Sequence, residues 1–277
     1  MQVLLLPTDF SETAKNAGMY ALKLADQLGI GRIVVYHSYE IPVTIDPMVP
    51  GIQMLDIDSL KEDSAKGLER FRLELLPFAN KGITIENFNE YGALTEGLDD
   101  VCRAVKADLV VMGITGGGII EETLIGSNTL SVAKHTHIPV IIVPSAATFT
   151  PIEEVMLTSD FDKEDRQVPV DAVRKLITET KAKLFVFHID EEADEYPPGK
   201  AGEDYALYSL LHELNPEFHF SQNKNYMEAV NDFSSEYQVD LIISLAKKHG
   251  FLGNLFAESH TKKLAFHSHV PVMVIHE

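Results

Sequence analysis

A glycine-rich stretch follows an apolar run near the middle of the chain, and its spacing suits the binding of an anion. In "DLVVMGITGGGIIEETLIGSN" (108–128), Gly113 stands three residues before Gly116, Gly126 follows ten residues later, and Ser127 comes directly after it. Glycines let a backbone approach a ligand closely. The helix-forming segment "SNTLSVAKH" then begins, so that Ser127 or Asn128 can cap a helix whose free N–H groups attract phosphate. The sequence therefore predicts a phosphate-binding turn, with a ligand-free flexible turn as the alternative.

Other glycine motifs do not fit this stretch. Gly113 and Gly118 have the separation of a Walker A loop, but Ile119 stands where that loop has its lysine. A dinucleotide fingerprint would follow the first strand, which instead gives "PTDFSET", and no G-x-S-x-G nucleophile elbow follows any strand. We therefore predict no catalytic residues and at most a weak ATPase activity.

The elements that position this turn alternate along the chain. Short, nearly continuous apolar runs are typical of buried parallel strands, and they occupy 3–6, 32–37, 83–88, 109–113 and 140–143. Between them, helical stripes are predicted over 12–28, 53–79, 93–105 and 127–135. This alternation predicts a parallel sheet with right-handed crossovers. The glycine-rich turn then lies at the carboxyl edge of the sheet, where open α/β folds bind ligands.

The second half of the chain repeats the first. The matching segments are "KLFVFHIDE" (183–191) with "RIVVYHSYE" (32–40), "DLIISL" (240–245) with "DLVVMG" (108–113), and "HSHVPVMVI" (267–275) with "HTHIPVIIV" (135–143). The last two matches share an offset of 132 residues, the difference between 240 and 108. We predict two tandem domains, 1–146 and 147–277, joined within "PSAATFTPIEE" (144–154).

The second copy loses the glycines. At the same offset, Leu245, Lys248 and Glu258 replace the three motif glycines, although Ser259 retains the serine. Glu258 puts a negative charge at the predicted helix N-terminus, where an anion would bind. Asp160 keeps the place that Asp9 has in the first half. The second domain is therefore predicted to keep the fold and to have a degenerate motif.

The pattern Gly113-x2-Gly116-x9-Gly126-Ser127 resembles the nucleotide-binding motif of the universal stress protein (UspA) family. "LLPTDFSETAKNAGMYALKLA" resembles the opening strand, acidic turn and first helix of that family, and "HIPVIIVP" resembles its final strand. The resemblance occurs once per half and identifies the chain as a tandem-type member. It implies two Rossmann-like, UspA-like α/β domains, each a five-stranded parallel sheet of order 3-2-1-4-5 flanked by helices. It also implies that the last strands of the halves pair antiparallel, as an intramolecular pseudo-dimer.

The resemblance further implies an adenine nucleotide at the ends of strands one, two and four. The residues that it assigns to this ligand are Asp9, Ser38, Gly113, Gly116, Gly126, Ser127, Asn128 and Thr129. Asp9 is placed near the ribose hydroxyls, the main chain of Ser38, after strand two, near adenine, and Gly113 against the ribose. The remaining residues are placed along the phosphates. For Asp9 the alternative is a turn-forming or helix-capping role, which Ser11 can serve equally well.

Glu121 and Glu122 lie inside the nine-residue insert and bear on the choice of nucleotide. Two carboxylates repel a triphosphate unless they point away from it or a divalent ion bridges them. ATP, ADP and AMP therefore all remain candidates, with or without Mg²⁺, and no metal-binding residues are predicted.

Composition limits the class of protein. The formal net charge of −19 argues against binding to nucleic acids or anionic membranes. No run approaches the roughly 20 apolar residues of a membrane span, and "MQVLLLPTDF" does not fit a signal peptide. Cys102 alone cannot form an internal disulfide, and we expect it to be buried and inert. A cytoplasmic location is predicted.

Two histidine pairs occupy equivalent places in the halves, namely His135 with His137 and His267 with His269. Across a pseudo-twofold axis they would be candidates for a zinc site, and the alternative is that they are polar loop residues.

Together these features predict a stress-response protein that binds one adenine nucleotide in its N-terminal domain and acts as a regulator. The alternatives are a slow ATP hydrolase and a ligand-free scaffold for an unknown protein partner. A homodimer is also left open.

Overall fold

The computed structural model describes residues 1–41, 57–114, 127–159, 170–189, 211–223, 225–246, 264–265 and 268–276. Several residues singled out in the sequence lie outside these ranges, namely Gly116, Gly118, Ile119, Glu121, Glu122, Gly126, Asp160, Lys248, Glu258, Ser259 and His267.

The first half alternates strands and helices as the sequence predicts. Its elements are β1 (Val3–Pro7), α1 (Glu12–Gln27), β2 (Arg32–Tyr39), α2 (Ile57–Leu75), the 3-10 turn η1 (Leu76–Phe78), β3 (Thr84–Tyr91), α3 (Leu94–Val105), β4 (Leu109–Ile114), α4 (Ser127–His135) and β5 (Val140–Pro144). The second half contains β6 (Glu154–Ser159), α5 (Val170–Thr180), β7 (Lys183–Ile189), η3 (His212–Leu214), β8 (Glu217–Ser221), α7 (Tyr226–Glu236), β9 (Leu241–Ala246) and β10 (Val272–His276).

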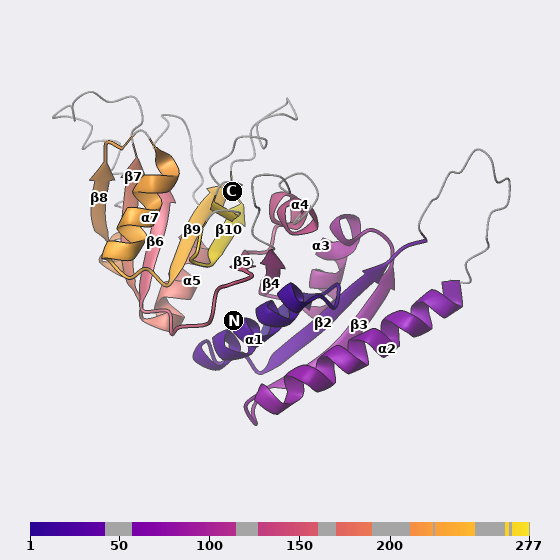
Figure 1. Cartoon of the computed structure of the whole chain (residues 1–277). Coiled ribbons are helices and arrows are strands. Elements are labelled where there is room, and N and C mark those ends of the chain that lie inside the picture. Colours follow the sequence, from indigo (N-terminus) through magenta and orange to yellow (C-terminus); the bar gives the residue numbers. More distant parts are fainter. Residues whose placement is uncertain are drawn as a thin grey trace, which may run out of the picture.

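All ten of these strands form one sheet, in the order β3-β2-β1-β4-β5-β10-β9-β6-β7-β8 (Figure 1). Each half therefore has the order 3-2-1-4-5, and the pairs within each half are parallel. This confirms the predicted fold class.

The last strands of the two halves pair antiparallel, as expected from the resemblance. In this pairing Ile141 lies opposite Met273, and these two residues are themselves related by the 132-residue offset. An approximate twofold axis therefore passes through that pair. Joining the two strands also covers two apolar edges that would otherwise be open to pairing with another chain.

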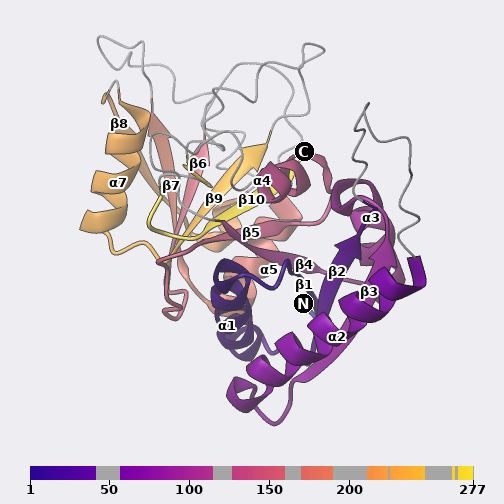
Figure 2. The ribbon, with the colours of Figure 1, turned by 45° about the vertical axis from the view of Figure 1, so that its right-hand side comes forward.

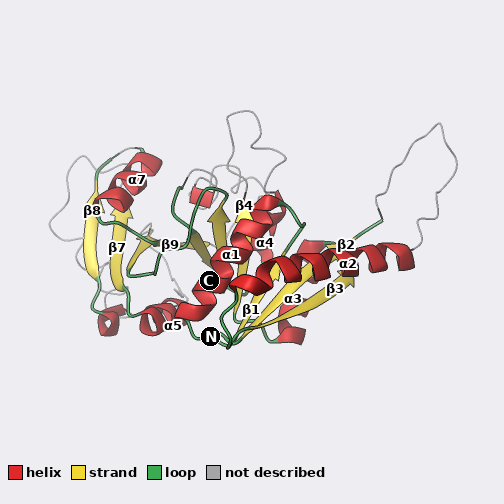
Figure 3. Cartoon of the chain, turned by 60° about the horizontal axis from the view of Figure 1, so that its bottom comes forward, coloured by secondary structure: helices red, strands yellow, loops and turns green. Residues whose placement is uncertain are grey.

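Helices cover both faces of the sheet, because the strand residues alternate between two apolar layers. On one face the apolar layer that contains Leu4 and Leu6 of β1 also contains residues of α1, α2 and α5, while on the other the layer with Val3 and Leu5 also contains residues of α3, α4 and α7. Figure 3 shows α1 and α2 crossing one side of the strands of the first half. In the part of the chain that the structure describes, no helix is long and apolar enough to cross a membrane.

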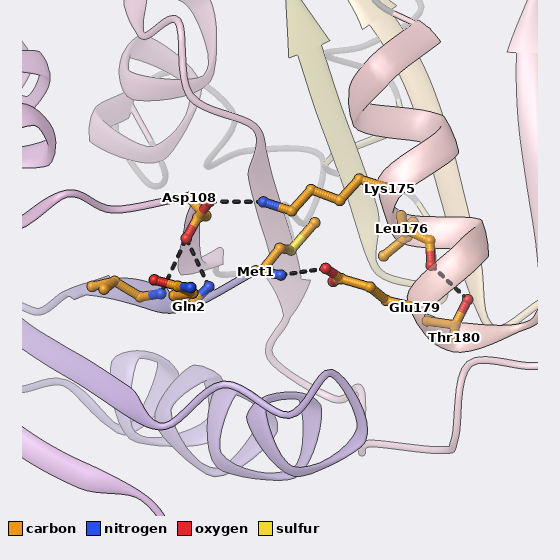
Figure 4. Close-up of polar contacts among 8 residues, drawn as sticks. Met1, Gln2, Asp108, Lys175, Leu176, Glu179 and Thr180 are labelled. Carbon is orange, nitrogen blue, oxygen red and sulfur yellow. Dashed lines mark hydrogen bonds and ion pairs between the residues drawn. The ribbon is translucent and has the colours of Figure 1, made fainter.

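Polar contacts also join the halves beside the central strand pair. Gln27 of α1 exchanges two hydrogen bonds with the main chain of Ile152, at 3.0 and 2.9 Å. On α5, Lys175 donates to Asp108, with 2.8 Å between Nζ and Oδ1, and Glu179 pairs with the Met1 amine (Figure 4). Burial alone would raise the pKa of Asp108, but hydrogen bonds from Lys175 and from two main-chain amides outweigh it and lower that pKa.

Candidate functional site

The segment after β1 carries an exposed carboxylate at the carboxyl edge of the sheet. The amide of Thr8 still donates to the Tyr36 carbonyl, at 2.8 Å, before the chain turns away from β2. Asp9 then accepts from the amide of Ser11, with 3.0 Å between nitrogen and Oδ1. Ser11, not Asp9, caps α1, because its Oγ accepts from the Ala14 amide. Asp9 therefore has the turn-forming role considered above, and its side chain remains exposed at the edge.

Ser38 lies inside β2 rather than after it, because the strand extends two residues beyond its predicted end at His37. It pairs in register with Glu90 of β3. Successive residues of a parallel strand present their main-chain groups to opposite neighbours; here the Tyr36 carbonyl faces β1 and the Tyr39 carbonyl faces β3. The N–H and C=O of Ser38 therefore point toward the β1 side, at a level where β1 has already ended.

Gly113 has a packing reason to be glycine. A Cβ at this position would lie 2.5 Å from the Thr13 carbonyl oxygen, in the first turn of α1. Such a distance requires the backbone of α1 to move, which is unfavourable in a packed core. The family resemblance places Gly113 against the ribose, but the contact of β4 with α1 alone accounts for a glycine here.

The first turn of α4 is tied to the same strand. Thr129 is buried, with 5% of its surface exposed, and its hydroxyl donates to the Gly113 carbonyl at 2.9 Å. That hydroxyl proton is therefore used within the protein. The helix begins at Ser127, whose side chain is not described, and Asn128 is exposed. The N-terminus of α4 thus stays close to the end of β4.

An aromatic cluster beside Asp9 was not identified from the sequence. Phe10 has a φ of 65°, and its ring lies 4.5 Å from the ring of His37. The same ring covers Gly67 of α2, where a Cβ would come within 2.7 Å of it. A glycine inside the amphipathic stretch "SAKGLERF" is a signal of close approach that could have indicated this contact.

His37 is held in place by a hydroxyl from α2. Its Nδ1 lies 2.8 Å from Ser64 Oγ, and Asn89 of β3 also donates to that oxygen at 3.3 Å. Burial lowers the pKa of His37, although the Asp9 carboxylate partly offsets this. The imidazole is therefore held mainly neutral near pH 7, and Phe10 and His37 form an apolar wall next to the Asp9 carboxylate.

Among the described residues, no group of three His, Cys, Asp or Glu side chains is placed to hold a metal ion. His135 Nδ1 lies 2.8 Å from the Ser131 carbonyl oxygen, within its own helix. Cys102 is buried, and burial raises the pKa of its thiol to about 12, in agreement with the inert role expected for it.

The order of the ten strands and their parallel pairing within each half define a doubled, Rossmann-like α/β protein. The family model of the universal stress protein family matches residues 1–144, more than half of the 277 residues. The chain belongs to the universal stress protein family.

Known relatives agree with this assignment. A universal stress protein of Methanocaldococcus jannaschii is 28% identical over 142 residues, which cover 50% of this chain and 80% of the relative. A universal stress protein of Archaeoglobus fulgidus has a solved structure that covers 99% of this chain and 98% of its own, with a TM-score of 0.72 and 19% identity. A Pseudomonas aeruginosa protein described as a universal stress protein covers 100% and 93%, with a TM-score of 0.62 and 10% identity. The two structures support the two-half fold over the whole chain.

Proposed function

We propose that this protein binds one adenine nucleotide at the carboxyl edge of its first half and acts as a cytoplasmic regulator in the response to stress. One observation carries the proposal: the Asp9 carboxylate, the Ser38 main chain and the first turn of α4 all face one edge of the sheet, within the part that the family model matches.

Each of these groups has a role that fits its chemistry. The exposed Asp9 carboxylate accepts hydrogen bonds from the ribose hydroxyls. The N–H and C=O of Ser38 are a donor–acceptor pair suited to the edge of adenine, and the apolar wall of Phe10 and His37 lies beside them. At the other end, the free N–H groups of α4 attract the phosphates.

The remaining members of the predicted site complete the turn. Gly116 and Gly126 bring the backbone close to the phosphates, and Ser127 and Asn128 add donors at the start of α4. Gly113 and Thr129 have a supporting role in this proposal, since their contacts hold α1 and α4 around the end of β4.

The proposal assigns the site to residues 1–146 and leaves residues 147–277 without ordinary nucleotide binding. Leu245 in β9 stands in the place of Gly113, and Glu258 stands in the place of Gly126, which directly precedes α4 in the first half. The predicted stoichiometry is one nucleotide per chain.

The test is calorimetry with AMP, ADP and ATP, with and without Mg²⁺, together with mass spectrometry of any ligand released from freshly purified protein. The variant Gly126→Glu copies the second half and is expected to abolish binding, whereas Glu258→Gly leaves both affinity and stoichiometry unchanged. Failure of all three nucleotides to bind the wild-type protein would overturn the proposal, and a stoichiometry of two would overturn the division between the halves.

The same samples distinguish a binding protein from a slow hydrolase. Release of ADP and phosphate over many turnovers, lost in both Asp9→Ala and Ser127→Ala, would identify an enzyme. If the protein binds a nucleotide with measurable affinity and does not hydrolyse it, the protein is a binding protein, and the bound nucleotide is itself the regulatory signal.

A further inference from the structure

A hydrogen bond from the second half reaches the helix that frames the proposed site. His276 is the last residue of β10, and its Nε2 contacts the main-chain oxygen of Ala133 in the last turn of α4. Figures 1 and 2 both show α4 beside β10. Because a carbonyl oxygen only accepts, Nε2 carries the proton in this contact.

The contact satisfies a group that the helix cannot satisfy alone. The last four carbonyls of an α-helix have no amide partner within the helix, and Ala133 is among the last four residues of α4. A histidine N–H at this end also interacts favourably with the negative end of the helix dipole. Since α4 has only nine residues, stabilising its last turn helps to hold the whole helix.

The equivalent contact, from the last strand of the first half to the second half, lacks its side-chain donor. At the 132-residue offset, Ala265 corresponds to Ala133 and Pro144 corresponds to His276. The correspondence is structural as well, because Ser268 donates to the Leu264 carbonyl just as Thr136 donates to the Val132 carbonyl. Proline has neither a main-chain N–H nor a side-chain donor. The Pro144 carbonyl instead accepts from Asn16 of α1, at 3.2 Å.

The positions of His276 and α4 show which edges of the sheet this contact joins. Strand β10 is parallel to β9, so His276 lies at the carboxyl edge of the second half, beside Ala246. Helix α4 begins at the carboxyl edge of the first half, where Thr129 ties its first turn to β4. One short helix therefore connects the carboxyl edges of the two halves.

We propose that His276 is a positioning residue through which the second half holds α4 and thereby sets the affinity of the first half for the phosphates of its ligand. The part that concerns affinity rests on the proposed nucleotide binding, whereas the part that concerns α4 does not. In this view the second half, with its own motif replaced, acts as a support for the one site.

The experiment uses the full chain with three variants. His276→Ala removes the donor, His276→Gln keeps an N–H at similar reach, and His269→Ala is the control, because His269 is exposed and precedes the same strand. Hydrogen–deuterium exchange of residues 129–137 without ligand is expected to rise roughly 3- to 10-fold in His276→Ala, the range for one lost hydrogen bond. It stays near the wild-type value in the other two variants.

Calorimetry with adenosine, AMP and ADP then separates a positioning role from a general loss of structure. His276→Ala is expected to weaken AMP and ADP roughly 3- to 10-fold and to leave adenosine unchanged, with His276→Gln close to the wild type. Unchanged exchange in α4, or equal weakening of adenosine and AMP, overturns the role of His276. If the wild type binds no nucleotide, the proposed function fails, while the exchange measurement still decides whether His276 holds α4.

Discussion

The carboxyl edges of the two halves differ most clearly at the end of the fourth strand. In the first half Gly113 lies against the Thr13 carbonyl, and the first turn of α1 packs directly on β4. In the second half the equivalent residue, Leu245, packs its side chain against the core. A Cβ at position 113 would prevent the close approach of α1 to β4, although the sheet order is the same in both halves. The sheet therefore tolerates either residue, while the close approach of α1 to β4 requires glycine.

The largest expected effect comes from copying the second half into the first. Gly113→Leu introduces a side chain where a Cβ alone would lie 2.5 Å from the Thr13 oxygen. Because the obstacle is backbone, we expect a loss of about 3 kcal/mol in the free energy of unfolding and the loss of nucleotide binding. Urea denaturation measures the first and calorimetry the second.

Gly82→Leu is the matched control, since no atom lies within 4 Å of a Cβ built there. It is expected to change stability by less than about 0.5 kcal/mol. If Gly113→Leu is as well tolerated as the control, packing against α1 does not explain the glycine.

A smaller difference lies within α3 and α7. Cys102 is buried in α3, and the residue at the 132-residue offset is Ser234 of α7, whose buried hydroxyl finds no partner among the described residues. We expect Ser234→Cys to raise the free energy of unfolding by about 1 kcal/mol, because an unsatisfied hydroxyl is removed. Cys102→Ser is expected to lower it by a similar amount.

Both variants are compared by denaturation under reducing conditions. Ser235→Cys serves as the control, because Ser235 is exposed and its hydroxyl already donates to the Asn231 carbonyl at 2.8 Å. A loss of stability in Ser234→Cys would mean that the Ser234 hydroxyl has a partner in solution.

The smallest expected effect concerns the ion pair that joins the halves. Lys175→Met removes the partner of Asp108, and we expect a loss of about 0.5 kcal/mol at pH 7, since both side chains are partly exposed. The folded-state pKa of Asp108 is lowered, so the pair stabilises the protein above the unfolded pKa of about 3.9. That stabilisation is lost as the pH falls through the folded pKa.

Denaturation curves are measured at several pH values. The free energies of unfolding of wild type and Lys175→Met are expected to differ at pH 7 and to become equal in acid. Lys23→Met, on the exposed side of α1, is the control. A difference that persists in acid would show that Lys175 acts through the packing of its aliphatic chain rather than through its charge.

The sheet could be predicted from the sequence because its inner strands, such as β1 and β5, are fully buried and appear as short apolar runs. The same signal ended β2 two residues too early, since its apolar run ends near His37 while the pairing with β3 continues to Tyr39. The contact of Gly113 with Thr13 joins residues far apart in the chain, so no local sequence pattern predicts it. Likewise, the sequence does not indicate which carbonyl accepts the hydrogen bond from Thr129 or from His276.

The approximate twofold axis through Ile141 and Met273 has a consequence for how the molecule can evolve. In a dimer of identical chains, every substitution appears at both ends of such an interface, because the interface is isologous. Here the two ends belong to one polypeptide and are encoded separately. A histidine can therefore arise at one end and a proline at the other, and mutation can specialise one copy while the other stays unchanged.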